Sequence, residues 1–119
     1  ELNHYVYFYH FKFSTLKEPS LWFTEGLAEY FGKSEYRLES INSSNINLNR
    51  SSSVPAGHEY WVGYTALLYI ENKYSEKAVY SVATNSYTMP LEKATKDAVG
   101  IGLNEWNSGW ENFIREIDK

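Results

Sequence analysis

The chain contains no cysteine, no cluster of basic residues and no long apolar run. Without cysteine, a disulfide framework and a cysteine-based zinc site are both excluded, so any bound metal must use histidine and carboxylate ligands. A membrane-spanning helix needs about 18 consecutive apolar residues, and no such run occurs, so we predict no membrane span.

Basic charge is scarce overall. Eleven Lys and Arg stand against fifteen Asp and Glu, a formal net charge of −4, which argues against nucleic acid as a main partner because phosphate binding needs a basic stripe. Aromatic residues are abundant at 18%, within a hydrophobic share of 43%. Such a chain can bury enough apolar area to offset its ordering entropy, and its 119 residues predict a single domain over 1–119.

Local patterns predict a mainly α-helical domain. Ser20 is a suitable N-cap for a helix that stops before Gly32, Ser75 caps another, Pro90 fits a first turn, and Asn104 caps the last helix. The predicted helices span 20–31, 58–73, 75–83, from 90 to Gly100 or Gly102, and from 104 to about 117. Residues 1–13 contain no Gly or Pro and can form a helix, although their Tyr and Phe content also suits a strand.

The longest predicted connection is the Ser- and Asn-rich segment 33–57, with a short strand near Tyr36–Leu38. Its residues 42–53 are expected to form a solvated loop, and a loop of this length is often functional. The helical spacing of Trp106 and Trp110 predicts that both pack in the core.

The first candidate site lies in Glu1-Leu2-Asn3-His4. On a helix that turns by about 100° per residue, Glu1 and His4 share one face, and a residue immediately before Glu1 lies on the other flank of that face. If that residue is histidine, the stretch reads H-E-L-N-H. This is the H-E-x-x-H arrangement, in which two imidazoles one turn apart bind Zn²⁺ and the glutamate acts as general base.

A third ligand is available in the segment 22–31, W-F-T-E-G-L-A-E-Y-F. Glu25 follows His4 by 21 positions, and a turn at Glu18–Pro19 lets the second helix fold back on the first. A carboxylate inside an otherwise apolar helix is costly to bury without a partner, and a metal ion is one such partner.

Together these segments resemble the gluzincin group of zinc metallopeptidases, most closely its peptidase-MA-like domains and more distantly bacterial collagenases. The resemblance extends through Gly63–Ile70, Lys73–Ser75, Leu91–Ala94 and the closing helix, but only residues 1–4 and 22–31 are specific. It implies the helical C-terminal subdomain of a zincin-like fold, acting on a peptide or protein substrate. The compartment stays open, although the resemblance favours a place outside a bacterial cell or at its surface.

The resemblance also implies roles for individual residues. His4 and Glu25 correspond to zinc ligands and Glu1 to the general base. Glu29 corresponds to a residue that accepts a hydrogen bond from a ligand histidine and so fixes its orientation. Peptide-bond hydrolysis in this group needs a further donor for the oxyanion. The candidates are Tyr60, Tyr64 and His58, and spacing does not choose between them.

One position departs from the family pattern, because the first histidine of the motif is not in this sequence. We expect a longer parent protein to supply it, together with the N-terminal β-sheet subdomain as a partner. By itself the chain keeps two of the three protein ligands, so we expect it to bind zinc poorly and to be inactive.

Two other interpretations stand beside the peptidase. One is a non-catalytic binding module on a decayed peptidase fold, which is favoured if the residue before Glu1 is not histidine. The other is an unrelated helical packing domain, in which the spacing from Glu1 to Glu29 is a coincidence.

Overall fold

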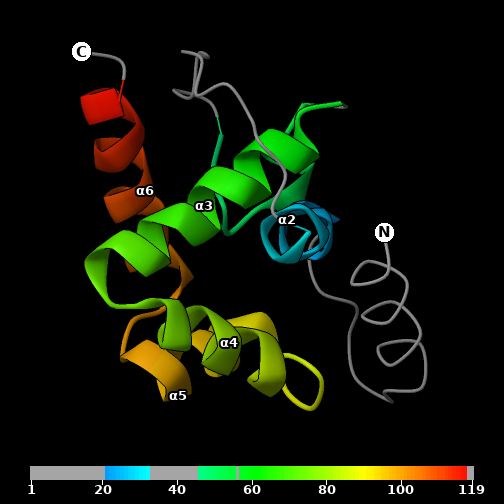
Figure 1. Ribbon diagram of the computed structural model, residues 1–119. Helices are drawn as coiled ribbons and strands as arrows, with labels where there is room; N and C mark the ends of the chain where they lie inside the picture. Colours follow the sequence, from blue (N-terminus) through cyan, green and yellow to red (C-terminus); the bar gives the residue numbers. More distant parts are fainter. Residues whose placement is uncertain (1–20, 33–45, 56, 118–119) are drawn as a thin grey trace.

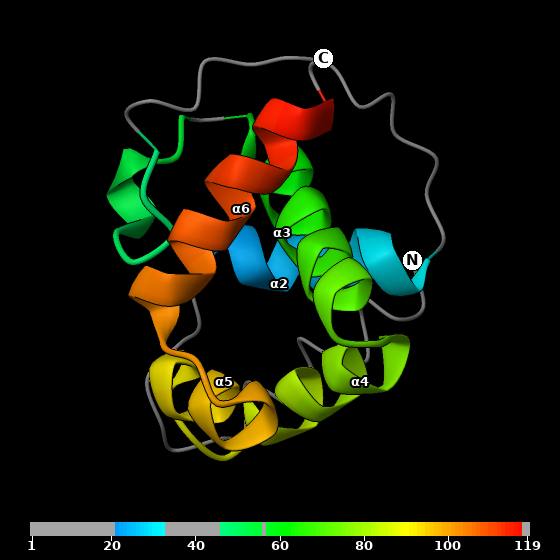
Figure 2. The ribbon, with the colours of Figure 1, turned by 90° about the vertical axis from the view of Figure 1, so that its left-hand side faces the viewer.

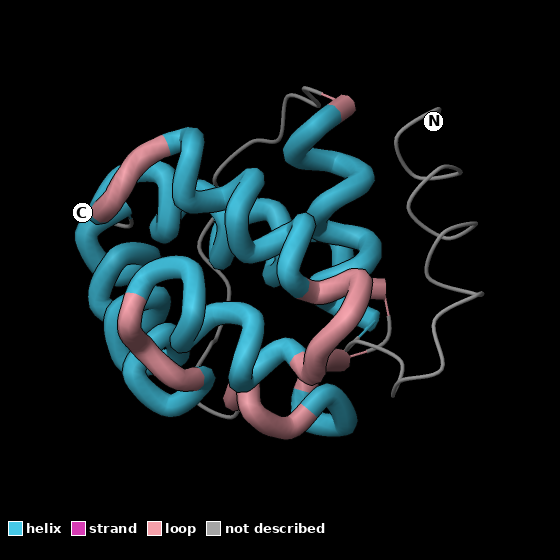
Figure 3. The backbone as a smooth tube through the Cα atoms, turned by 90° about the horizontal axis from the view of Figure 1, so that it is seen from below, coloured by secondary structure: helices cyan, strands magenta, loops and turns pink. Residues whose placement is uncertain are grey.

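The structure is a computed structural model that describes residues 21–32, 46–55 and 57–117, and these residues are mainly helical (Figure 1). Within these ranges there is no strand, in agreement with the predicted mainly α fold (Figure 3). The elements are α2 (Leu21–Phe31), the 3₁₀ turn η1 (Ser51–Ser53), α3 (Glu59–Lys73), α4 (Glu76–Asn85), α5 (Leu91–Val99) and α6 (Leu103–Ile117). Residues 1–13 and the strand predicted near Tyr36–Leu38 lie outside the described residues.

Most predicted helix boundaries are confirmed. Helix α2 ends at Phe31, and the N–H of Gly32 closes its last turn on the carbonyl of Ala28 at 2.9 Å. The hydroxyl of Ser75 accepts a hydrogen bond from the N–H of Ala78 at 3.1 Å, as an N-cap should. Helix α5 ends at Gly100, whose φ of +84° is a left-handed conformation that glycine adopts without steric cost.

The N-terminus of α6 differs from the prediction. Asn104 lies inside the first turn and is not its cap, because α6 begins at Leu103. The backbone N–H of Leu103 donates instead to the carboxylate of Glu92 on α5, at 2.8 Å. The Asn104 side chain accepts a hydrogen bond from Asn49 at 3.0 Å. A carboxylate distant in sequence has therefore taken the capping role.

Helices α2 and α3 cross in close contact, and α2 is seen nearly end-on where α3 passes it in Figure 1. The contact is made by Gly26 and Gly63. A Cβ placed on Gly63 would come within 2.6 Å of the Gly26 Cα and closer still to the carbonyl oxygen of Trp22. Only glycine allows the backbones to approach to this distance.

A tryptophan-rich core fills the space beside this crossing. Trp22, Phe23 and Trp106 pack edge to face, with ring centroids 5.4 to 6.3 Å apart. The indole N–H of Trp106 donates to the carbonyl of Ala66 at 3.1 Å, and that of Trp110 donates to the Thr65 hydroxyl at 2.9 Å. Both α6 tryptophans are fully buried, which confirms their predicted place in the core. Figure 2 shows α6 running alongside α3, with α2 behind them.

The predicted solvated loop 42–53 is wrong in part: Asn49, Arg50 and Ser52 are exposed, but two residues of the loop are buried. These are Ile46 and Leu48, and Val54 just beyond is buried as well. The Leu48 carbonyl accepts the indole N–H of Trp22 at 3.1 Å, and its N–H donates to the Asn107 side chain at 2.8 Å. The apolar side chains of this segment therefore join the core, and the backbone of Leu48 pairs with polar groups of α2 and α6.

No helix in the described ranges has the length and apolar character that crossing a membrane requires.

The glycine crossing predicts an unusual response to alanine. Alanine favours a helix over glycine by up to about 1 kcal/mol, so helix propensity alone predicts that Gly63→Ala stabilises the protein. Because the new methyl group would meet backbone atoms that cannot move independently, we expect a loss of about 3 kcal/mol instead. Urea unfolding followed by circular dichroism measures the free energy of unfolding.

Gly109→Ala on α6 is the matched control. Its new methyl group would meet the phenol of Tyr69, a half-buried side chain that can rotate away, so the cost should be clearly smaller. An equal effect of the two substitutions would mean that the α2–α3 contact is not the limiting one.

The Glu92 cap predicts a pH-dependent contribution to stability. The hydrogen bond from Leu103, followed by that from Lys96, lowers the pKa of Glu92 below its ordinary value of 4.5. A lowered carboxyl pKa stabilises the fold above the ordinary pKa, and this contribution is lost as pH falls through the lower value. Glu92→Gln should therefore destabilise the protein at pH 7, and the difference from wild type should shrink towards pH 3. A difference independent of pH in urea titrations would contradict this role.

Candidate active site

Two carboxylates on α2 form the base of the candidate site. Glu25 is only 9% exposed, although the residues around it on α2 are mostly apolar. Glu29 follows one turn later, about 40° further round the helix, and is half-buried. Both predicted acidic positions therefore lie on the same side of α2.

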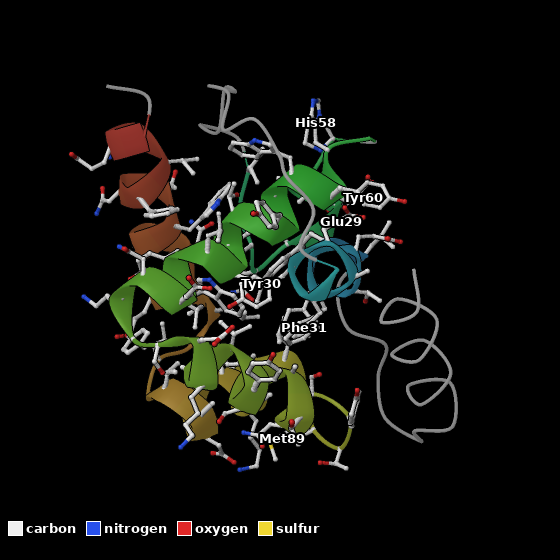
Figure 4. All side chains as sticks on the ribbon, in the orientation of Figure 1. Glu29, Tyr30, Phe31, His58, Tyr60 and Met89 are labelled. Atoms are coloured by element: carbon white, nitrogen blue, oxygen red, sulfur yellow. The ribbon has the colours of Figure 1, made fainter. Side chains whose placement is uncertain are left out.

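The first turns of α3 bring a phenol to these carboxylates. Tyr60 is 39% exposed, and the charge of Glu25 is the main cause that raises its pKa above 10.0. Burial, the charge of Glu29 and a hydrogen bond that Glu25 accepts from the phenol raise this pKa further. Figure 4 shows Tyr60 and Glu29 close together on the upper side of α2. A raised pKa keeps the phenol protonated, so it remains a hydrogen-bond donor at neutral pH.

The other two predicted donors lie at the start of α3 or just before it. Tyr64 is half-buried one turn further along α3, on the same face as Tyr60. His58 precedes α3 as its N-cap residue, is exposed, and lies above Tyr60 in Figure 4. Of the three candidates, Tyr60 is the one for which the structure describes an interaction with Glu25, and the assignment of the oxyanion donor stays a prediction.

The predicted zinc ligand His4 and general base Glu1 lie outside the described residues. Among the residues that the structure does describe, no group of three or more His, Asp or Glu side chains could hold a metal ion. Glu25 and Glu29 are the predicted metal-site residues that are described, and they are carboxylates, which suit zinc, calcium or magnesium alike.

One positioning residue was missed from the sequence. Gly63 allows α3 to approach α2 and so carries Tyr60, three residues earlier, to the carboxylate of Glu25. A glycine in the middle of a predicted helix was the available signal, since glycine there is costly unless close packing requires it.

Removing the charge of Glu25 should lower the pKa of Tyr60 towards its ordinary value. We expect Glu25→Gln to give the largest decrease, Glu29→Gln a smaller one and Glu59→Gln the smallest, which is the order of their electrostatic effects on the phenol. NMR titration of ¹³C-labelled tyrosine measures the pKa, and Tyr60→Phe assigns the resonance among eleven tyrosines. An unchanged pKa in Glu25→Gln would show that the two side chains do not interact.

No family model, curated protein or solved structure matches this chain. The resemblance to gluzincins therefore stays a prediction from the sequence, based on residues 1–4 and 22–31.

Proposed function

We propose that this chain is the helical part of a zinc-dependent metallopeptidase that hydrolyses peptide bonds. The observation that carries the proposal is the buried carboxylate of Glu25, which stands in the segment that resembles the gluzincins and faces the phenol of Tyr60. A buried ionisable group coupled to a hydrogen-bond donor is the arrangement found at many active sites.

The chemistry of these side chains fits a zinc ion. Zinc in catalytic sites is commonly held by two histidines and one glutamate, with one position left for water. In this chain His4 and Glu25 would be ligands, and the histidine expected before Glu1 would complete the set. Glu29 would accept a hydrogen bond from a ligand imidazole and hold its orientation.

The chain's own residues then divide the work of hydrolysis. A zinc ion at this place supplies Lewis-acid activation of water and of the scissile carbonyl. Glu1 accepts the proton of the attacking water and delivers it to the leaving amine. Tyr60 donates a hydrogen bond to the carbonyl oxygen as negative charge develops there, because a phenol is protonated at neutral pH.

The test uses the natural protein with its own sequence upstream of Glu1. We expect His4→Ala and Glu25→Gln each to weaken zinc binding by more than about 100-fold, because loss of a hydrogen-bonded outer partner already costs about 10- to 100-fold. Glu29→Gln should fall within that smaller range. Competition with a chromophoric chelator measures the affinity, and a quenched fluorogenic peptide reports hydrolysis.

Three controls separate metal binding from catalysis. Glu1→Gln should bind zinc normally but lose hydrolysis, and Glu105→Gln, an exposed carboxylate on α6, should change neither. Zinc bound at Glu25 should also lower the pKa of Tyr60, since the metal offsets the carboxylate charge. A residue other than histidine before Glu1, or zinc affinity unaffected by Glu25→Gln, would overturn the proposal.

A further inference from the structure

A second group of functional side chains lies at the other side of α2. In Figure 4, Tyr30 and Phe31 lie below α2, towards α4, whereas Glu29 and Tyr60 lie at its upper side. The group comprises three aromatic residues and two glutamates from three helices, here called the aromatic–acidic surface: Tyr30, Phe31, Glu71, Glu76 and Tyr80. No step of the proposed hydrolysis uses it.

The aromatic part is continuous and reaches solvent. The rings of Tyr30 and Phe31 pack edge to face with centroids 5.2 Å apart, and those of Phe31 and Tyr80 are 4.8 Å apart at 36°. Tyr80 remains 51% exposed, the most exposed large hydrophobic side chain in the described ranges. An aromatic face left open in this way can accept a cation, because the ring quadrupole is negative over its faces.

The charges around these rings are negative. The Tyr30 phenol donates a hydrogen bond to the carboxylate of Glu71, and the charges of Glu71 and Glu76 contribute, after burial, to the raised pKa of Tyr30. Glu76 and Tyr80 are four residues apart on α4 and so share one face. Both carboxylates are exposed, and one carboxylate can accept several hydrogen bonds, so a ligand can reach them.

The helix ends reinforce this negative potential. Phe31 is the last residue of α2, and Glu71 lies in the last turn of α3, where the helix dipoles are negative. Of the neighbouring cations, Lys73 lines the groove between α3 and α6, whereas Lys77 is exposed and lies three residues before Tyr80 on α4, so it borders this surface. The two glutamates outnumber this lysine on the surface.

We infer that the aromatic–acidic surface is a docking site for a basic, arginine-bearing segment of a polypeptide partner. Charge complementarity selects a cationic partner, and the rings select arginine over lysine. The planar guanidinium can stack on Tyr80 while donating paired hydrogen bonds to Glu76, whereas lysine carries a compact, strongly hydrated charge. This inference does not depend on the proposed hydrolysis.

Binding of acetylated tetra-arginine amide to the natural protein tests the inference by titration calorimetry and by ¹³C-tyrosine NMR. We expect the peptide to bind and to shift the Tyr80 resonance, and tetra-lysine to bind more weakly. The neutral tetra-citrulline peptide should not bind. Tyr80→Ser should weaken arginine binding by about two- to fivefold, and Glu76→Gln by roughly twofold or more.

Matched controls locate the site. Tyr74→Ser removes an exposed tyrosine that influences Tyr69 on the α6 side, and Glu105→Gln removes an exposed charge on α6. Neither should alter binding. Equal binding of the citrulline peptide, no binding of tetra-arginine, or unchanged affinity in Tyr80→Ser and Glu76→Gln would overturn the inference. Loss of binding in Glu29→Gln alone would move the site to the candidate active site and would also overturn it.

Discussion

The close contact between Gly26 and Gly63 is the constraint on which the described structure depends. It brings the backbones of α2 and α3 nearer than any side chain would allow. Glycine in a helix costs free energy, so two glycines facing each other across a crossing offset that cost through packing. The contact also positions two polar side chains. Glu25 directly precedes Gly26, and Tyr60 lies almost one turn before Gly63. The crossing therefore brings the buried carboxylate of Glu25 close to the phenol of Tyr60.

The tryptophans hold the helices around that crossing in a defined register. Trp22, Trp106 and Trp110 are buried, and each donates its one indole N–H to an acceptor, whereas the buried indole nitrogen of Trp61 has none within the described ranges. The acceptors come from other segments, for example Leu48 for Trp22 and Ala66 for Trp106. Sliding one helix along another would leave an N–H unpaired inside the core, at a cost of about 1–3 kcal/mol. Burial of apolar surface has no preferred direction, so these hydrogen bonds help to fix the positions of the helices relative to one another.

Features that depend on neighbouring residues in the chain, such as helix positions and caps, were predicted from the sequence. Features that depend on contacts between distant residues were missed. Helix periodicity and the caps at Ser75 and Gly100 placed α2 to α6 to within a few residues. Asn104 is of a residue type that commonly caps helices, but the N–H of Leu103 at the start of α6 donates to the carboxylate of Glu92. In the same way, the many Ser and Asn residues around Leu48 predicted a solvated loop, although Leu48 itself is buried. His4 and Glu1 remain predictions.

Helix α2 serves two surfaces because each residue turns its side chain by about 100°. With Gly26 fixed against α3, Glu25 and Glu29 face the start of α3, and Tyr30 reaches Glu71 at its end. The adjacent residues Glu29 and Tyr30 thus belong to different chemical environments. Glu29 lies with Glu25 near the phenol of Tyr60, and Tyr30 lies among aromatic rings and glutamates. A single contact that sets the rotation of α2 therefore determines both surfaces at once, so any change that rotates this helix must disturb the two together.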